Sequence, residues 1–222
     1  MSIRDPRILR LKTTDDMLDI LVSRGKSLTS FKKGQRIFVW NKMRKGYSYL
    51  LQEAPGENMA PEFKPYATPG EMLAGGAFEG KYLNDCLLEF PAEWFLNAIQ
   101  LGKLCPGSPD VSVNLFGVDS RKPLSYWVES GWLPSAHGGH KKAQHPELSD
   151  AKLNPDERGW FQWYCRYWMG RRMPELDNVQ IGRWRSFARH AGAVRKGCKP
   201  KDISCRRGER QALLQWAYDP FI

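Results

Sequence analysis

The sequence predicts a mainly α-helical protein of the α+β class, with a small N-terminal β-hairpin and an aromatic-rich C-terminal subdomain of three helices. Helical periodicity with clear start and stop signals dominates from position 155 onward, whereas strand-like alternation occurs only near positions 35–51. We divide the chain into residues 1–150, an α+β region with an acidic middle, and residues 151–222, a basic three-helix subdomain. We expect the two parts to form one compact unit.

The N-terminal region is expected to begin with a helix and a hairpin. Thr13, followed by Asp16 and an apolar run, predicts a capped helix that ends at Gly25. Residues 35–40 and 47–51 have the composition of two strands joined by a short turn. That turn is basic, because it contains Lys42, Arg44 and Lys45.

Short elements separated by proline and glycine are expected in the middle of the chain. Prolines break residues 55–69 into an extended connection. Thr68, Pro69 and Glu71 supply an N-cap hydroxyl, a first-turn proline and a third-position carboxylate, so a helix should begin there and end at Gly75. The remaining segments are expected to be short helices at 79–88 and from 90 onward, a loop at 105–125 and an exposed loop at 135–150.

Three helices are expected after position 155. The first has aromatic residues around most of its circumference, so it should be buried. The second, from about Asp177 to Val194, has one apolar face and one basic face that should meet solvent. The third covers residues 206–218. Its first turns hold cations where the helix dipole disfavours them, so an external anion would explain Arg206, Arg207 and Arg210.

The charged residues are segregated along the chain. Residues 158–210 contain 14 basic and 4 acidic side chains, so the net charge of this segment is +10, the same as that of the whole chain. Residues 1–45 carry a net charge of +8, and residues 46–157 carry −7. Two interpretations stay open: the basic ends bind an external polyanion, or they pair with the acidic middle inside one fold.

The bulk composition is typical of a soluble globular protein. Hydrophobic residues make up 41% and charged residues 26% of the chain. No apolar run approaches the roughly 20 residues of a membrane span, and the N-terminus lacks the apolar core of a secretory signal. We therefore expect a cytoplasmic protein, or a nuclear one in a eukaryotic host. The five cysteines are odd in number and widely spread, which favours reduced thiols over a disulfide framework.

The best catalytic candidate is a glycine-rich turn at residues 75–86 that contains Lys81 and Asp85. Glycines allow a backbone to approach a phosphate, and a desolvated lysine is a nucleophile. The segment loosely resembles the helix-hairpin-helix turn of base-excision DNA glycosylases, although the spacing from lysine to aspartate differs by one residue. The alternative is a loop in which Lys81 and Asp85 form an ordinary i,i+4 pair.

Two groupings have metal-binding residue types. His137, His140 and His145 lie in the expected loop, and His190 lies upstream of Cys198 and Cys205. Neither supplies four ligands at the spacing of a structural zinc site, so we predict no metal and no cofactor.

Several motifs together resemble a family of uncharacterised microbial proteins. They are Gly-Trp-Phe-Gln-Trp-Tyr at 159–164 with Gly-Arg-Arg at 170–172, and Arg-Gln-Ala-Leu-Leu-Gln-Trp-Ala-Tyr at 210–218. The resemblance extends back through most of the chain and implies no function. It marks residues 135–150 as an insertion, which lowers the importance of the three histidines there.

The segregated charge predicts a nucleic-acid-binding protein, with duplex DNA as the expected partner, and no membrane association. Two alternatives stay open: an enzyme that processes a nucleic-acid base at Lys81, as in DNA repair, and a module that binds an acidic protein. The expected nucleic-acid contacts are Lys42, Arg44, Lys45, Arg185, Arg189, Arg195, Lys196, Arg206, Arg207 and Arg210.

Overall fold

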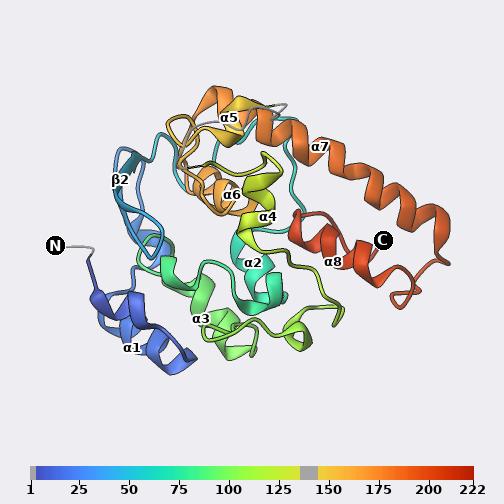
Figure 1. Ribbon diagram of the computed structural model, residues 1–222, viewed down its shortest axis with the longest axis horizontal. Coiled ribbons are helices and arrows are strands. Elements are labelled where there is room, and N and C mark those ends of the chain that lie inside the picture. Colours follow the sequence, from blue (N-terminus) through green and yellow to red (C-terminus); the bar gives the residue numbers. More distant parts are fainter. Residues whose placement is uncertain (1–3, 136–144) are drawn as a thin grey trace.

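A computed structural model of the chain describes residues 4–135 and 145–222. In these residues the protein is mainly α-helical, with one two-stranded sheet (Figure 1). The α-helices and strands are α1 (Thr14–Arg24), β1 (Arg36–Trp40), β2 (Lys45–Leu50), α2 (Pro69–Ala74), α3 (Ala92–Gln100), α4 (Leu124–Glu129), α5 (Pro146–Ser149), α6 (Trp160–Trp168), α7 (Pro174–Gly197) and α8 (Arg207–Gln215). Short 3-10 turns lie at Pro6–Arg10, Leu28–Ser30, Phe78–Gly80, Asn84–Cys86 and Val111–Val113.

The locally encoded elements form as expected. Thr13 caps α1 and Thr68 caps α2, each through a complete capping box with the acidic residue three positions later. In the antiparallel hairpin, Ile37 pairs with Tyr49 and both side chains are buried, so one face of the hairpin covers the core.

The helix predicted at residues 79–88 does not form. Two 3-10 turns replace it, because Glu79 and Leu83 adopt left-handed backbone angles with φ of 57° and 60°. Long-range bonds hold this conformation: the amide of Glu79 donates to the side chain of Asn114 at 2.7 Å, and the carbonyl of Gly80 accepts from the amide of Cys105 at 2.8 Å. The prediction failed because these tertiary contacts override local helical propensity.

The C-terminal helices lie where the sequence places them, but α7 is longer than expected. It begins at Pro174 and continues to Gly197. Its N-terminal half packs on the body of the protein, and its C-terminal half runs toward one end of the molecule beside α8 (Figure 1). A separate small cluster formed by Ala191, Val194 and Leu213 joins these two helices.

An aromatic core holds α6 and α7 against the proline-rich connection. Phe63, in that connection, is surrounded edge-to-face by rings of both helices, with centroid distances from 4.9 Å to Trp184 to 6.5 Å to Trp160. A single cluster of buried apolar side chains extends from Ile8 to Ala217. Residues on both sides of position 150 therefore contribute to one core.

Buried ion pairs join the basic C-terminal quarter to the acidic middle of the chain. Arg166 is fully buried and donates to Glu89 at 2.6 Å and to Asp156 at 2.8 Å. Arg171 donates to Asp156 at 2.6 Å. Internal charge pairing, one of the two interpretations of the charge pattern, is therefore present for these residues.

The cysteines correct one expectation. Cys198 and Cys205 form a disulfide that links the residue after the end of α7 to a residue two positions before the start of α8, whereas Cys86, Cys105 and Cys165 carry thiols. The expectation of five reduced thiols was wrong because the Cα atoms of Cys198 and Cys205, seven positions apart, are brought to 5.7 Å by the loop between two helices. Within the described residues, none of the helices has both the length and the apolar character to cross a membrane.

Candidate nucleic-acid interface

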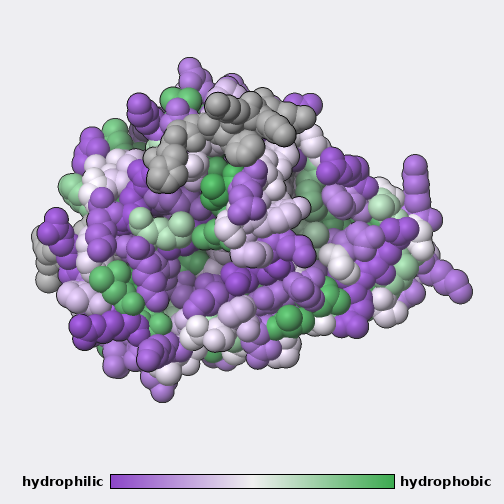
Figure 2. All heavy atoms as spheres, in the orientation of Figure 1, coloured by the Kyte–Doolittle hydropathy of each residue, from purple (hydrophilic) through white to green (hydrophobic). Residues whose placement is uncertain are grey.

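The exposed face of α7 carries unpaired cations. Arg185, Arg189 and Lys196 lie four and seven positions apart, so they project from the same side of the helix, and all three are exposed. We call them the cationic stripe. In the part of the chain that the structure describes, none of them forms an ion pair, and the same holds for the exposed Arg195. Figure 2 shows hydrophilic side chains gathered over the end of the molecule where α7 terminates.

The arginines that follow α7 are partly committed to the protein itself. Arg206 is exposed and pairs with Glu209 at 2.8 Å. Arg207 is exposed, but its Nε donates to the carbonyl of Phe116 at 2.8 Å. Both can meet an external anion only by adding to, or exchanging, these contacts.

Arg210 was wrongly expected at the surface. Its side chain is fully buried, and its guanidinium donates to backbone carbonyls of Asp202, Cys205, Pro220 and Ile222 at 2.7–3.0 Å. Arg210 therefore fastens the loop after α7 and the C-terminal residues to α8. The sequence pattern hid this role, because all three arginines at the start of the helix looked alike.

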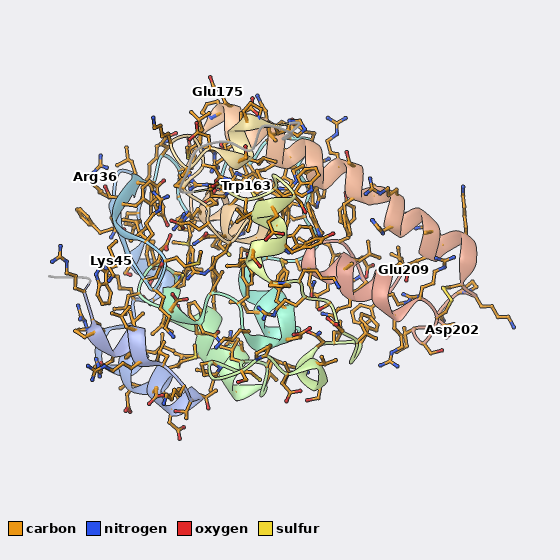
Figure 3. The ribbon with its side chains drawn as sticks, viewed as in Figure 1. Arg36, Lys45, Trp163, Glu175, Asp202 and Glu209 are labelled. Carbon is orange, nitrogen blue, oxygen red and sulfur yellow. A yellow bond between two sulfur atoms is a disulfide. The ribbon has the colours of Figure 1, made fainter. Side chains whose placement is uncertain are left out.

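The basic hairpin tip is a separate patch. Arg44 forms an ion pair with Glu157, whereas Lys42 and Lys45 are exposed. Lys45 lies at one end of the long axis of the molecule, and Asp202 and Glu209 lie at the other (Figure 3). The two basic ends of the chain therefore do not converge on one patch.

Lys81 and Asp85 are near each other but have different partners. Asp85 is buried and accepts from Arg158 Nη2 at 2.8 Å and from the amide of Lys42 at 2.8 Å. Lys81 Nζ donates to the carbonyls of Pro106 and of Gly107, the latter at 2.8 Å. Burial lowers the pKa of Lys81, and the charges of Lys42 and Arg121 lower it further. Among the described residues no ion pair joins Lys81 to Asp85, and each is bonded to other parts of the chain.

The structure reveals an aromatic cleft that the sequence did not. Two cavities, of about 810 and 310 Å³, share five lining residues, and we call the pair the tryptophan cleft. Both volumes lie in the range of clefts that hold small molecules, about 300–1,000 Å³. Rings from segments far apart in the sequence supply its walls. The shared lining residues are Trp127, Trp132, Arg183, Phe187 and Trp216.

Arg183 is the central cation of the cleft. Its guanidinium carbon lies 4.6 Å from the ring centroid of Trp132 and 5.4 Å from that of Trp216. Its one side-chain hydrogen bond within the described residues is to Gln180 Oε1 at 2.9 Å, and it forms no ion pair there. Burial without a compensating acid lowers the pKa of Arg183 to about 10, so the group stays charged at neutral pH.

The charged side chains that line the cleft are arginine and lysine. Arg121, Lys122 and Arg158 line the smaller cavity, and Arg189 lines the larger one. Within the described lining of both cavities there is no aspartate or glutamate. Arg158 is only 8% exposed, and its Nη1 is buried without an acceptor among the described residues. Asp85 pairs with Arg158 and Glu79 with Arg121, so the lining cations that form no ion pair among the described residues are Lys122, Arg183 and Arg189.

The histidines provide no metal site in the described residues. His145 lines the larger cavity and His190 the smaller one, where burial lowers the pKa of His190 and the charge of Arg189 lowers it further. His137 and His140 lie outside the described residues. Cys198 and Cys205, the possible companions of His190, are joined in the disulfide.

Sequence reasoning missed the cleft for a clear reason. Arg183 appeared only as one of the 14 cations of the basic segment, and Trp127 and Trp132 carried no periodic signal. The one local hint is Gly182 beside Arg183 on the same helix, since a glycine at an exposed helical position leaves open space next to its neighbour. Comparison of the chain with protein-family models, with curated proteins and with solved structures finds no match.

Proposed function

We propose that this protein binds nucleic acid, with the cationic stripe of α7 contacting phosphates. One observation carries the proposal: Arg185, Arg189 and Lys196 share an exposed face, lack acidic partners in the described residues, and meet the tryptophan cleft at Arg189. Cations that fold stability does not use, beside stacked aromatic rings, are the two elements of nucleic-acid binding surfaces.

The buried arginines strengthen the argument by contrast. Arg158, Arg166 and Arg171 each pair with an acid of the middle region, so the protein neutralises cations where the fold needs them. The stripe on α7 is left out of this pairing. An external polyanion is the partner whose charge complements it.

The test is binding of a fluorescent oligonucleotide, single-stranded and duplex, measured against salt concentration. The wild-type affinity should fall steeply, with each phosphate contact adding a log–log slope of about 0.9 for duplex or about 0.7 for single strands. Changing Arg185, Arg189 and Lys196 together to Gln should remove a slope of about 2–3.

The matched control changes the exposed Arg10, Lys26 and Lys32 to Gln, which alters the net charge equally at the N-terminal end of the chain. This control should bind as the wild type does. Equal losses in both variants would reduce the proposal to a net-charge effect. Absence of binding to either oligonucleotide at low salt, with an acidic protein co-purifying instead, would overturn it.

A further inference from the structure

The tryptophan cleft has the chemistry of a site for a flat ring that carries an anion beside it. Trp127 is 37% exposed, and Trp132, Trp216 and Phe187 are only partly buried, so ring surface remains accessible inside the cleft. Stacks already formed among the protein's own rings, such as Phe187 on Trp216 at 4.7 Å, fix these walls in place. Rigid aromatic walls are the usual platform for stacking a nucleic-acid base.

The unpaired groups of the cleft indicate what else the occupant carries. Arg183 holds its charge between two tryptophan rings with only an amide oxygen as partner, and the buried Nη1 of Arg158 lacks an acceptor in the described residues. Both are donors and neither can accept a hydrogen bond. An occupant with ring carbonyl oxygens or a phosphate would supply further acceptors to the guanidinium of Arg183, whereas an apolar occupant would supply none.

The position of the cleft relative to α7 selects the source of this ring. Arg183 belongs to α7 and lies one helical turn or less from Arg185 and Ser186, and Arg189 of the cationic stripe is itself a lining residue. A strand whose phosphates follow the stripe would therefore pass the mouth of the cleft. A base of that strand, once unstacked, could enter the cleft.

We infer that the tryptophan cleft receives one unstacked base of a nucleic-acid strand held by the cationic stripe, with the ring stacked on tryptophan and its oxygens facing Arg183. This inference rests on the proposed function, because the stripe must hold the strand. It adds a preference for single strands and for unpaired bases, and it assigns binding to the cleft without a chemical step at Lys81.

The experiment compares two strands of equal length, about 8 nucleotides and within the usual site sizes of such proteins. One carries bases, and the other is abasic throughout, so that only its sugar and phosphate groups remain. The wild type should bind the base-containing strand about 5- to 150-fold more tightly, the range that stacking of one base provides. Trp127→Ala and Arg183→Gln should abolish this preference, so that each variant binds the two strands about equally.

Tyr126→Ala is the matched control, because Tyr126 is an exposed ring beside Trp127 that does not line either cavity. It should keep the preference. Arg183→Lys tests the planar cation: it retains the charge, so a reduced preference would identify the flat guanidinium as the recognising group. Thermal unfolding of each variant separates loss of recognition from loss of fold.

The outcomes distinguish the two ideas. If the wild type binds neither strand, both the proposed function and this inference fail. If it binds both strands equally, the stripe binds phosphate and the inference about the cleft is overturned. Tighter binding of a free mononucleotide than of the strand would also overturn it, because the ring would then come from a small molecule.

Discussion

The arginines of residues 158–210 differ in their surroundings. Those paired with acids stabilise the fold, whereas those without an acidic partner are candidates for binding a ligand. Arg166 is fully buried, yet Glu89 and Asp156 neutralise it, and its guanidinium carbon lies 5.3 Å from the ring centroid of Tyr47. Arg183 is half-buried, and its charge meets two tryptophan rings and the amide oxygen of Gln180 but no acid among the described residues. A cation that the fold does not neutralise is a group that a ligand can use.

Asp156 should control much of the stability at low pH. Burial raises the pKa of Asp156, but the charges of Arg171 and Arg166 outweigh burial and hold it below the ordinary value. The ionised form therefore favours the folded state, so its contribution is complete above the unfolded pKa of about 3.9 and is lost as the pH falls through the lower folded pKa.

We expect Asp156→Asn to lower the free energy of unfolding by about 3–5 kcal/mol at neutral pH, because it leaves Arg171 and Arg166 short of a buried acid. The variant should also lose less stability in acid than the wild type. Urea unfolding at several pH values measures both effects. Asp15→Asn, in the exposed first turn of α1, should cost under about 1 kcal/mol; an equal cost in the two variants would contradict this role of Asp156.

At the scale of elements, the sequence predicts what neighbouring residues determine. The N-terminal ends of α1 and α2 follow from capping boxes within four residues, so they were predicted correctly. The turns at Phe78–Gly80 and Asn84–Cys86 depend on partners more than 20 positions away, so they were not. The tryptophan cleft is the extreme case, because Trp127, Trp132, Arg183 and Trp216 meet only in the folded chain.

The disulfide should stabilise the junction of α7 and α8. Closing a loop across seven positions contributes about 2–3 kcal/mol in the chain-entropy description. We expect Cys198→Ser to lower the denaturant midpoint accordingly and to increase hydrogen exchange in residues 186–197, which have only a small cluster of their own.

Cys105→Ser is the control, because Cys105 carries a thiol and lies outside this junction. It should leave exchange in residues 186–197 unchanged. Unaltered exchange there in Cys198→Ser, or in the wild type treated with a reductant, would show that the cluster of Ala191, Val194 and Leu213 is sufficient without the disulfide.

At the scale of the whole molecule, acids from the middle of the chain form ion pairs with some of the arginines of both basic ends. Arg44, Arg158, Arg166 and Arg171 are matched by acids of residues 46–157, whereas the cationic stripe of α7 and Lys42 and Lys45 at the hairpin tip form no ion pair among the described residues. These two groups lie toward opposite ends of the long axis (Figure 3). One short strand is therefore expected to use only one of them.

Lys45→Gln should accordingly leave the affinity for a strand of about 8 nucleotides unchanged, whereas Arg189→Gln should weaken it and reduce the salt slope by about 0.7. Fluorescence anisotropy with the same strand measures both variants. A comparable loss in Lys45→Gln would place the bound strand at the hairpin instead of at α7.

Gly170, just after α6, lies against the backbone of Gln52 and Glu53, so the C-terminal helices depend on a distant part of the chain. Gly170 adopts φ of +105°, and its carbonyl accepts from the amides of Gln52 and Glu53 at 2.8 and 3.1 Å. A Cβ at this position would lie 2.0 Å from the carbonyl oxygen of Glu53. The residues after α6 are therefore held by hydrogen bonds from Gln52 and Glu53, which lie outside residues 151–222. Phe63, also outside that range, packs among the rings of α6 and α7. We therefore expect residues 151–222 not to fold when separated from the rest of the chain, so ligand binding by this segment requires residues 52–63 as well.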